Sequence, residues 1–456
     1  MSPTPLMISV AGIRGIIGES LTPPIVARFA AAFARELPAG PVVLGRDARS
    51  TGPMVRDAAL AGLTAAGRDV VDLGLATTPT TQLAVEHLHA AGGIILTASH
   101  NPAPWNALKF LSDLGEFLGP EAGARVRQRY ESERDLYVPW NQVGSVREES
   151  NALRWHLDRV LGLDLLDLAA IRGRKLHVVV DGCASIGGIA VPALLKELGA
   201  KTTELDCVPN GRFTRELEPL PEHLGALGAR VKEAGADFGV AVDPDADRAA
   251  FVDARGVPLG EEYTVALGCS VVLEKHKGPV VTNLSTSRIL DAVCSRAGVA
   301  LHRTPVGEAH VVAGMRTKGA IAGGEGNGGM ILPAAHYGRD SLVATALIVE
   351  AMTASRRTLR ELADALPRLH MIKEKISRPD TPWEQSAESL RRHFSQHTLD
   401  TADGLRFSRD EEWLHVRPSG TEPVVRLIAE SPSETRTRDL IEQARGALAA
   451  AAARSS

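Results

Sequence analysis

The chain of 456 residues is long enough for roughly three domains of ~150 residues each, or four if one is small. Its 44% hydrophobic and 23% charged residues are typical of a globular protein, and no apolar run approaches the ~20 residues of a membrane span. The 51 Lys and Arg against 55 Asp and Glu leave a net charge of −4, and only 4% of residues are aromatic, which argues against nucleic acid and anionic membranes as partners.

Short apolar runs rich in Val and Ile alternate along most of the chain with segments in which apolar residues return every three or four positions. The first pattern predicts buried strands at 41–44, 93–97, 177–180, 238–243 and 279–282. The second pattern predicts helices at 25–36, 56–66, 83–91, 221–234, 287–297 and 341–355. Strands and helices in alternation indicate an α/β fold, with parallel sheets covered by helices on both faces.

The pattern changes near Pro367. Beyond it, a polar stretch, short strands at 413–416 and 424–428 and an Ala-rich helix from about Glu434 predict a smaller α+β unit. Polar, turn-rich breaks lie near 141–149, 253–258 and 367–373. These breaks predict four domains, at 1–145, 146–253, 254–367 and 368–456.

The sequence TASHNP at 97–102 directly follows an apolar run. A strand that ends in small and polar residues presents them at the carboxyl edge of a sheet, where open α/β sheets bind ligands. Ser99 is therefore a candidate nucleophile, and His100 could orient a transferring group. Lys109, seven residues past Pro102, could supply a positive charge or a proton. Taken alone, the segment also suits a simple turn before the proline.

The sequence DPDADR at 243–248 carries three carboxylates at alternate positions, again at the end of an apolar run. Such a loop needs a cation to offset the mutual repulsion of its charges, and an all-oxygen ligand set favours Mg²⁺, Mn²⁺ or Ca²⁺. A calcium EF-hand is excluded because its Gly and Glu positions hold Arg248 and Ala254. A solvated acidic turn is the alternative.

The sequence GGEGNGG at 323–329 contains the pattern GxGxxG, but no helix is expected after it, and a carboxylate inside the loop would repel a pyrophosphate. Glu325 and Asn327 on a glycine frame are better suited to sugar hydroxyls, because they accept and donate hydrogen bonds. A glycine-rich hinge or tight turn is the alternative interpretation.

The sequence RPSGTEP at 417–423, with Arg426 beyond it, combines arginines, hydroxyls and backbone N–H groups around a glycine. This set suits the geometry of a phosphate dianion. The chain contains no GxxxxGK[ST] pattern, so the loop is not a nucleotide P-loop. Surface arginines beside an ordinary turn are the alternative.

Together and in this order, the four loops resemble those of the α-D-phosphohexomutase superfamily, which interconverts 1-phosphosugars and 6-phosphosugars through a phosphoserine enzyme. GIRG at 12–15 and GRDARST at 45–51 resemble two further segments of that superfamily, with Thr51 in place of a Ser. The resemblance covers nearly the whole chain. It implies three similar α/β domains with mainly parallel mixed sheets, and a smaller C-terminal α+β domain that grips phosphate, around a central cleft.

The resemblance also implies a role for each loop. Ser99 would carry the phosphoryl group, with Lys109 and Arg14 as acid–base and charge-stabilising candidates and His100 beside them. One Mg²⁺ would be bound by an oxygen of the phosphoserine and by Asp243, Asp245 and Asp247. The residues expected to recognise the sugar and its non-reacting phosphate are Arg248, Glu308, Glu325, Asn327, Arg417, Ser419, Gly420, Thr421 and Arg426.

The reaction implied is an intramolecular phosphoryl transfer between O1 and O6 of a hexose phosphate. Phosphoserine would first donate to the sugar monophosphate and give a 1,6-bisphosphate. That intermediate would turn round in the cleft and return its other phosphate to Ser99. Glucose 1,6-bisphosphate or glucosamine 1,6-bisphosphate would serve as activator.

The sugar loop GEGNGG and the turn VGEAHV at 306–311 look most like those of archaeal-type phosphoglucosamine mutases. This predicts conversion of glucosamine 6-phosphate to glucosamine 1-phosphate, towards UDP-N-acetylglucosamine, with Glu308 favouring the 2-ammonium group. Phosphomannomutase or phosphoglucomutase activity is the alternative within the superfamily. Ala107 in place of the usual Gly of NGxK, and Asn327 in place of the commoner Ser, put only substrate contacts in doubt.

Two readings from other classes compete with a mutase. A Mg²⁺-dependent phosphatase or phosphonate-type hydrolase would use an aspartate nucleophile and would leave TASHNP without a role. A sugar-phosphate-binding protein without activity would be expected to have lost Ser99 or an aspartate, yet both are present.

The four cysteines, Cys183, Cys207, Cys269 and Cys294, are scattered, without a CxxC pair or a nearby His at ligand spacing. They indicate reduced thiols. With no basic and apolar leader in MSPTPLMISV, we expect a cytoplasmic protein, monomeric or homodimeric.

Overall fold

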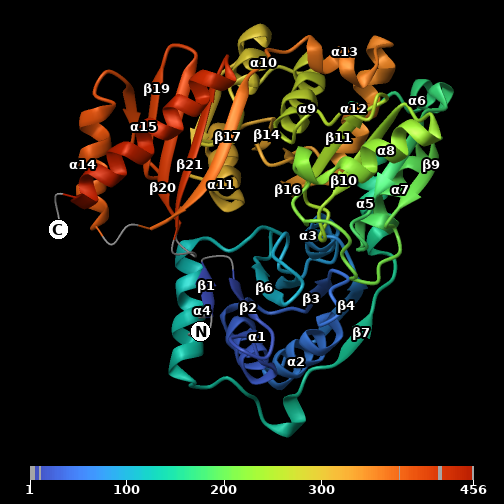
Figure 1. The fold of residues 1–456 in the computed structure, drawn as a ribbon. Coiled ribbons are helices and arrows are strands. Elements are labelled where there is room, and N and C mark those ends of the chain that lie inside the picture. Colours follow the sequence, from blue (N-terminus) through green and yellow to red (C-terminus); the bar gives the residue numbers. More distant parts are fainter. Residues whose placement is uncertain (1–5, 10–11, 379–380, 420–423, 454–456) are drawn as a thin grey trace.

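The computed structural model describes residues 6–9, 12–378, 381–419 and 424–453, which form four sheets with their helices. Figure 1 shows the first domain, in blue, below the other three, and the fourth domain, in orange and red, at the upper left. The predicted fold class is confirmed, since three α/β domains with mixed sheets precede a smaller α+β domain around one cleft. Within the described ranges, no helix is both long and apolar enough to cross a bilayer.

The first sheet contains, in spatial order, β1 (Met7–Ser9), β2 (Gly12–Ile16), β6 (Trp105–Leu111), β5 (Gly92–Leu96), β3 (Val42–Arg46), β4 (Val70–Leu75) and β7 (Val146–Glu148). The helices of this domain are α1 (Pro23–Glu36), α2 (Gly52–Ala65), α3 (Thr78–His87) and α4 (Pro120–Ser132), followed by the 3-10 turn η1 (Trp140–Gln142). Val42 and Leu44 pack towards α1 and α2, whereas Val43 packs towards α3. Both faces of β3 are therefore buried, which is why its sequence is an unbroken apolar run.

The structure corrects the predicted helix 83–91, because α3 begins five residues earlier. The hydroxyl of Thr77 accepts from the N–H of Thr80 at 3.0 Å, and Pro79 occupies the first turn, so the segment TTPTT starts a helix. Strands β1, β2, β4, β6 and β7 of this sheet were not predicted. The domain limits remain a prediction; β7, which pairs with β4, lies just beyond residue 145.

The second sheet contains, in spatial order, β11 (Ala249–Asp253), β10 (Phe238–Val242), β8 (His177–Asp181) and β9 (Lys201–Leu205). Its helices are α5 (Ala152–Leu161), α6 (Leu168–Arg174), α7 (Gly187–Glu197) and α8 (Gly225–Ala234). The predicted helix 221–234 is divided into the 3-10 turn η2 (Pro221–His223) and α8. Val178 and Val180 belong to the apolar cluster that contains α7, and Val179 belongs to the cluster of α8, so helices cover both faces.

The third sheet contains, in spatial order, β13 (Leu301–Thr304), β12 (Val280–Asn283), β14 (Ala322–Glu325), β15 (Gly329–Leu332) and β16 (His336–Arg339). Its helices are α9 (Glu262–Lys275), α10 (Ile289–Ala297), α11 (Glu308–Lys318), α12 (Ser341–Ser355) and α13 (Leu359–Asp364). Helix α12 contacts α6 and α7 of the second domain as well as α9. One apolar cluster therefore runs through the second and third domains.

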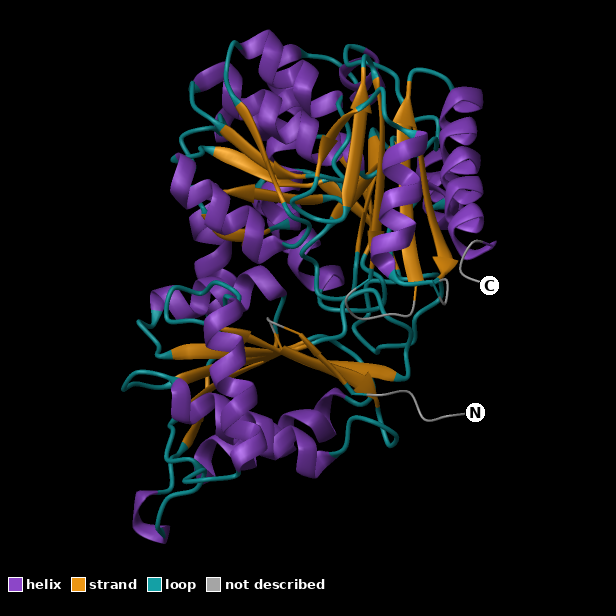
Figure 2. Ribbon diagram, turned by 90° about the vertical axis from the view of Figure 1, so that its left-hand side faces the viewer, coloured by secondary structure: helices purple, strands orange, loops and turns teal. Residues whose placement is uncertain are grey.

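The fourth sheet is antiparallel throughout its described strands, β17 (His370–Ser377), β21 (Val424–Ser431), β20 (Glu412–Pro418), β19 (Leu405–Arg409) and β18 (Thr398–Asp400). Its core is formed with α14 (Trp383–His393) and α15 (Glu434–Ala453). Figure 2 shows this sheet upright beside those helices, and the first sheet nearly edge-on with helices on both faces. The change to an α+β unit after Pro367 is as predicted.

Candidate active site

The four domains enclose a cleft with a volume of about 650 Å³. It is lined by predicted site residues from every domain, namely Arg14, His100, Arg248, Glu308, Glu325, Asn327, Arg417 and Arg426. Ser99 and the aspartates of the predicted metal loop are buried, and Ser99 and Asp247 are next in sequence to the lining residues His100 and Arg248. The chain thus brings together segments that are far apart in the sequence, from Arg14 to Arg426, as is usual for a ligand site between domains.

Ser99 lies three residues beyond the end of β5, in a backbone conformation with φ of 50°. Its side chain points to the second domain, where the hydroxyl donates to Asp243 Oδ2 at 3.1 Å. The residue is 4% exposed. A left-handed conformation is uncommon for a serine and is kept only where the surroundings enforce it, so the loop holds this hydroxyl in a defined place.

Arg49 helps to hold the serine loop in this conformation. Its buried guanidinium donates to the carbonyl oxygens of Ser99 and Asn101, both at 2.6 Å, and to that of Pro102 at 2.9 Å. Its Nε pairs with Asp47 at 3.1 Å, and Asp47 also accepts from Thr97 at 2.7 Å. One arginine from the GRDARST segment therefore binds the backbone of the serine loop through several hydrogen bonds.

Asp243, Asp245 and Asp247 follow β10 and are fully buried. One oxygen of each lies within 4.8 Å of the others. Asp245 Oδ2 accepts from Lys109 Nζ at 2.8 Å and from the Thr78 hydroxyl at 2.7 Å. The second oxygens of Asp245 and Asp247 have no hydrogen-bond partner within the described part of the chain. Buried carboxylate oxygens of this kind are what a hard divalent cation coordinates, so the trio fits Mg²⁺.

The charges of the trio support the same fit. Burial, together with the carboxylates of Asp247 and Asp245, raises the pKa of Asp243 well above its usual range. Burial would also raise the pKa of Asp245, but the ammonium group of Lys109 outweighs it and holds that pKa below its usual range. Three ionised carboxylates in this space are therefore strongly repulsive unless a cation lies between them.

Lys109 and Arg14 approach the serine loop from the neighbouring strands β6 and β2. Arg14 Nη1 donates to Asn101 Oδ1 at 2.6 Å and lines the cleft. Lys109 is bound to the metal loop through Asp245 rather than to the serine itself. The two cations thus contact the serine loop through Asn101 and the metal loop through Asp245.

His100 in the serine loop and Arg248 after the metal loop both line the cleft. His100 Nδ1 is 3.5 Å from Ser99 Oγ, and burial together with the charge of Arg248 lowers its pKa to about 3. The ring is therefore neutral at neutral pH. Arg248 pairs with Glu218 at 2.9 Å, while its buried Nε has no hydrogen-bond partner among the described residues. That donor is suited to a ligand oxygen.

The sugar loop closes the cleft on the side of the third domain. Glu325 Oε1 accepts from Asn283 Nδ2 at 2.8 Å and from the N–H of Gly307 at 2.9 Å. Its Oε2 pairs with Arg339 at 2.9 Å. The Asn327 amide is satisfied when its nitrogen donates to the Glu325 carbonyl at 3.3 Å and its oxygen accepts from Arg339 at 3.2 Å. Both predicted sugar ligands are thus held in place by protein donors.

The predicted phosphate cradle lies on the fourth domain. Arg417 and Arg426 are directly opposite each other on β20 and β21, and like charges in such a pair repel unless an anion lies between them. Arg417 Nε is buried without a hydrogen-bond partner in the described ranges, and Asp403 lies 3.7 Å from this guanidinium. Ser419 donates its N–H to Val424 at 2.9 Å. Gly420 and Thr421 lie outside the described residues.

Sequence models of phosphoglucomutase/phosphomannomutase alpha/beta/alpha domains I, II and III match residues 7–136, 156–256 and 260–370, and that of the C-terminal domain matches 371–447. The chain belongs to this family. It is thereby an enzyme of the isomerase class, an intramolecular phosphotransferase, as the sequence predicts.

One relative, a protein of Thermococcus kodakarensis named phosphoglucomutase/phosphomannomutase, is 37% identical to this chain. The match covers 94% of this chain and 96% of the relative. A probable phosphoglucosamine mutase of Methanopyrus kandleri is also 37% identical, over 95% of both chains. A solved family member from Burkholderia thailandensis superposes with a TM-score of 0.84 at 26% identity, covering 98% of this chain and 97% of the other. The predicted likeness to archaeal-type phosphoglucosamine mutases is confirmed.

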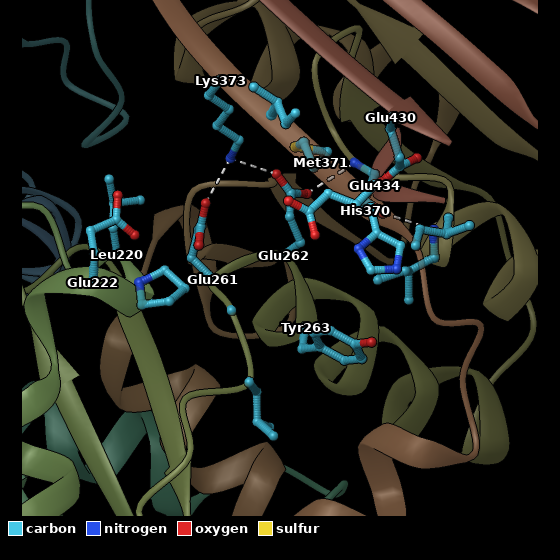
Figure 3. Close-up of a pocket in the computed structure, with 17 residues that line it drawn as sticks. Leu220, Glu222, Glu261, Glu262, Tyr263, His370, Met371, Lys373, Glu430 and Glu434 are labelled. Carbon is cyan, nitrogen blue, oxygen red and sulfur yellow. Dashed lines mark hydrogen bonds and ion pairs between the residues drawn. The ribbon is translucent and has the colours of Figure 1, made fainter. Parts of the chain in front are cut away.

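Five residues that contact the serine, metal or sugar loop were not predicted from the sequence as site residues. They are Arg49, Thr78, Asn283, Arg339 and Lys373. Figure 3 shows Lys373 reaching from β17 to Glu261 and Glu262 above a second pocket of about 420 Å³. Its Nζ is 2.7 and 2.8 Å from those carboxylates and 3.2 Å from the carbonyl oxygen of Gly326. Lys373 therefore joins the fourth domain to the sugar loop.

Proposed function

We propose that this protein moves a phosphoryl group between O1 and O6 of a hexose phosphate, with Ser99 as the phosphoryl carrier. The observation that carries the proposal is the 3.1 Å hydrogen bond between Ser99 Oγ and Asp243, made across the boundary between two domains at the edge of the cleft. A hydroxyl next to a cation site is where a phosphoserine could be stabilised and its leaving oxygen relieved of charge.

Each set of residues has a distinct task in this proposal. Bound Mg²⁺, held by the three aspartates, would withdraw charge from the phosphoryl group. Arg14, Lys109 and Arg248 surround the same space and offer further positive charge. Arg417 and Arg426, with Ser419, Gly420 and Thr421, would grip the phosphate that does not react, and this grip holds the sugar hydroxyl in line with Ser99.

The reaction then consists of two balanced transfers. In the first, the free sugar hydroxyl forms a bond to phosphorus and gives up its proton to the site, the bond between phosphorus and Ser99 Oγ breaks, and the freed serine oxygen takes up a proton from the site. The bisphosphate turns round so that its other phosphate faces Ser99. In the second transfer Ser99 Oγ takes that phosphate and the sugar oxygen recovers a proton. Neutral His100, 3.5 Å from Ser99 Oγ, orients the serine oxygen in both steps.

We further propose that glucosamine phosphate is the preferred sugar. Support comes from the Methanopyrus relative and from the buried Glu308 beside the cleft, which brings negative charge to the sugar side. The Thermococcus relative, equally similar and named phosphoglucomutase/phosphomannomutase, makes activity on glucose and mannose phosphates the second candidate. A phosphatase with an aspartate nucleophile is disfavoured, because it would leave the hydrogen bond between Ser99 and Asp243 without a role.

The test is an assay of the purified protein with the 6-phosphates of glucosamine, glucose and mannose, each with Mg²⁺ and a trace of the matching 1,6-bisphosphate. Formation of the 1-phosphate, fastest with glucosamine, is expected. Release of inorganic phosphate in place of an isomer would overturn the proposal.

Ser99→Ala should abolish turnover, and intact-mass measurement should show that a phosphoryl group present on the wild-type chain is missing from this variant. Ser112→Ala, in a turn after β6, is the matched control and should keep both the turnover and the phosphoryl group. Near-wild-type activity of Ser99→Ala would rule out Ser99 as the carrier.

A further inference from the structure

Arg339, the last residue of β16, makes ion pairs with carboxylates of three separate segments. Its guanidinium lies 2.6 Å from Asp247 in the metal loop, 2.9 Å from Glu308 at the start of α11, and 2.9 Å from Glu325 in the sugar loop. The side chain is 9% exposed, and the residue lines the cleft. A planar guanidinium can bind several carboxylates at once, which a lysine ammonium does poorly.

We propose that Arg339 is a positioning residue that fixes the metal loop and the sugar loop relative to each other, and that the two glutamates it holds, Glu308 and Glu325, make the sugar subsite favour an amino sugar. The inference rests on the proposed function for the identity of the sugar. It assigns to Arg339 a role in metal affinity and sugar binding, and to Glu308 a role in sugar selection.

The fit of Arg339 against the sugar loop supports this role. A side-chain carbon on Gly329 would lie 2.3 Å from Arg339 Cδ and 2.9 Å from its Cγ. The backbone of Gly329 is not left-handed, so contact with the arginine, rather than backbone conformation, requires the glycine. The methylene groups of Arg339 therefore fill the space beside the last residue of GEGNGG.

The backbone around Arg339 is itself tied to the metal loop. Ser341 Oγ donates to the carbonyl oxygen of Ala246 at 2.7 Å. Asp340 accepts from the N–H of Leu342 at 2.7 Å and contacts the ring of His156 at 2.7 Å. The segment from Arg339 to Ser341 thus holds the metal loop at two points, Ala246 and Asp247, and cannot shift independently of it.

The charge around Arg339 points to the class of sugar. One guanidinium is shared by three carboxylates, and Asp247 belongs also to the proposed cation site, where its Oδ1 is 3.7 Å from Arg248 Nε. Within this cluster, Glu308 and Glu325 share the single positive charge of Arg339, so Arg339 alone does not neutralise both carboxylates. A 2-ammonium group on the sugar would complete that balance, whereas a 2-hydroxyl would not.

The test uses binding rather than turnover. In the Ser99→Ala background, Mg²⁺ affinity is measured from Mg²⁺-dependent thermal stabilisation, and the Kd values of glucosamine 6-phosphate and glucose 6-phosphate are measured by calorimetry. Arg339→Met should raise the Mg²⁺ concentration for half-maximal stabilisation roughly tenfold and weaken both sugars. Arg339→Lys, which keeps the charge and should fold, is expected to weaken them in the same direction. Arg360→Met, which removes a 2.7 Å ion pair with Asp253, is the matched control.

Glu308→Gln tests the charge separately, because it keeps the shape of the side chain and the Arg339–Glu325 pair. It should reduce the preference for glucosamine over glucose phosphate roughly tenfold. Unchanged Mg²⁺ affinity and Kd values in both Arg339 variants would overturn the positioning role, and an unchanged sugar preference in Glu308→Gln would overturn the charge argument. A protein that shows these effects yet does not interconvert the isomers would contradict the proposed function alone. A wild-type chain that binds no hexose phosphate would overturn both.

Discussion

The ammonium group of Lys373 in the fourth domain lies 3.2 Å from the carbonyl oxygen of Gly326 in the sugar loop of the third. Glu262, whose Oε1 is 2.8 Å from the same ammonium, lies so close to Gly326 that a side-chain carbon there would be 1.9 Å from its Oε2. The sugar loop is thus held between a cation from one domain and a carboxylate from another. Glycine at 326 is what permits this approach.

Lys373→Met should therefore raise KM for hexose phosphates more than it lowers kcat, because it frees the sugar loop without touching the metal loop. We expect a rise of roughly tenfold, in line with the loss of a hydrogen bond from a charged donor. Steady-state kinetics measures the change in KM and the change in kcat separately. Lys277→Met, which removes a lysine that donates to Leu273 outside the cleft, is the control. A change confined to kcat would contradict the role of Lys373 in holding the loop.

Asp245→Asn should weaken Mg²⁺ dependence and rate together. The substitution removes one negative charge from the trio and breaks the 2.8 Å pair with Lys109. The Mg²⁺ concentration for half-maximal activity should rise at least about tenfold. Asp291→Asn, which removes the half-exposed partner of Arg303, tests whether loss of any aspartate has this effect. An unchanged Mg²⁺ titration would count against the metal loop.

Arg417→Ala should lower the affinity for the 1-phosphate and the 6-phosphate alike, since either end of the sugar must occupy the cradle while the other reacts. A charge-assisted contact to phosphate contributes about 1.5–3 kcal/mol, so KM should rise roughly 10- to 100-fold in both directions. The reaction is followed from each side. Arg409→Ala, an exposed arginine on β19 of the same sheet, is the control. A rise in KM for only one of the two isomers would argue against a single cradle.

His415 predicts a dependence of stability on pH. It is fully buried between the third and fourth domains, with Nδ1 2.9 Å from Ser285 Oγ and Nε2 2.5 Å from the carbonyl oxygen of Asp403. Burial lowers its pKa to about 4, against ~6.5 in an unfolded chain. Between these values the unfolded state binds more protons, so the free energy of unfolding falls as the pH falls.

The wild type should therefore lose more thermal stability between pH 7 and pH 4.5 than His415→Gln, in which an amide can replace both hydrogen bonds without titrating. The difference should be on the order of 1–3 kcal/mol. Thermal unfolding across this pH range measures it, with the exposed His393→Gln as control. Equal pH profiles for the wild type and His415→Gln would show that the pKa of His415 is the same in the folded and unfolded states.

The sequence shows the main loops of the candidate site because their chemistry is local. Ser99 and the aspartate trio each follow an apolar strand, so their position at the edge of a sheet can be predicted from the neighbouring residues alone. Arg339 has no such signal, since its role depends on three carboxylates that are 14 to 92 positions away. Long-range partners of this kind follow from how domains pack, which composition and periodicity do not encode.

Local signals were also missed where two patterns competed. The segment TTPTT at 77–81 resembles a turn, yet Thr77 caps the helix and Pro79 suits its first turn, so α3 begins there. Strand β6, which carries Lys109, has a mixed sequence, WNALKFL, in which an asparagine and a lysine interrupt the apolar pattern. Its antiparallel partners on both sides stabilise it as a strand.

The apolar cluster that runs through the second and third domains, with α12 packed against helices of both, bears on how this protein can be re-engineered. The second and third domains cannot be exchanged one at a time without exposing half of a common interior. The first and fourth domains enclose apolar clusters of their own, so chimaeras with relatives should exchange either end separately and transplant the middle two as one piece.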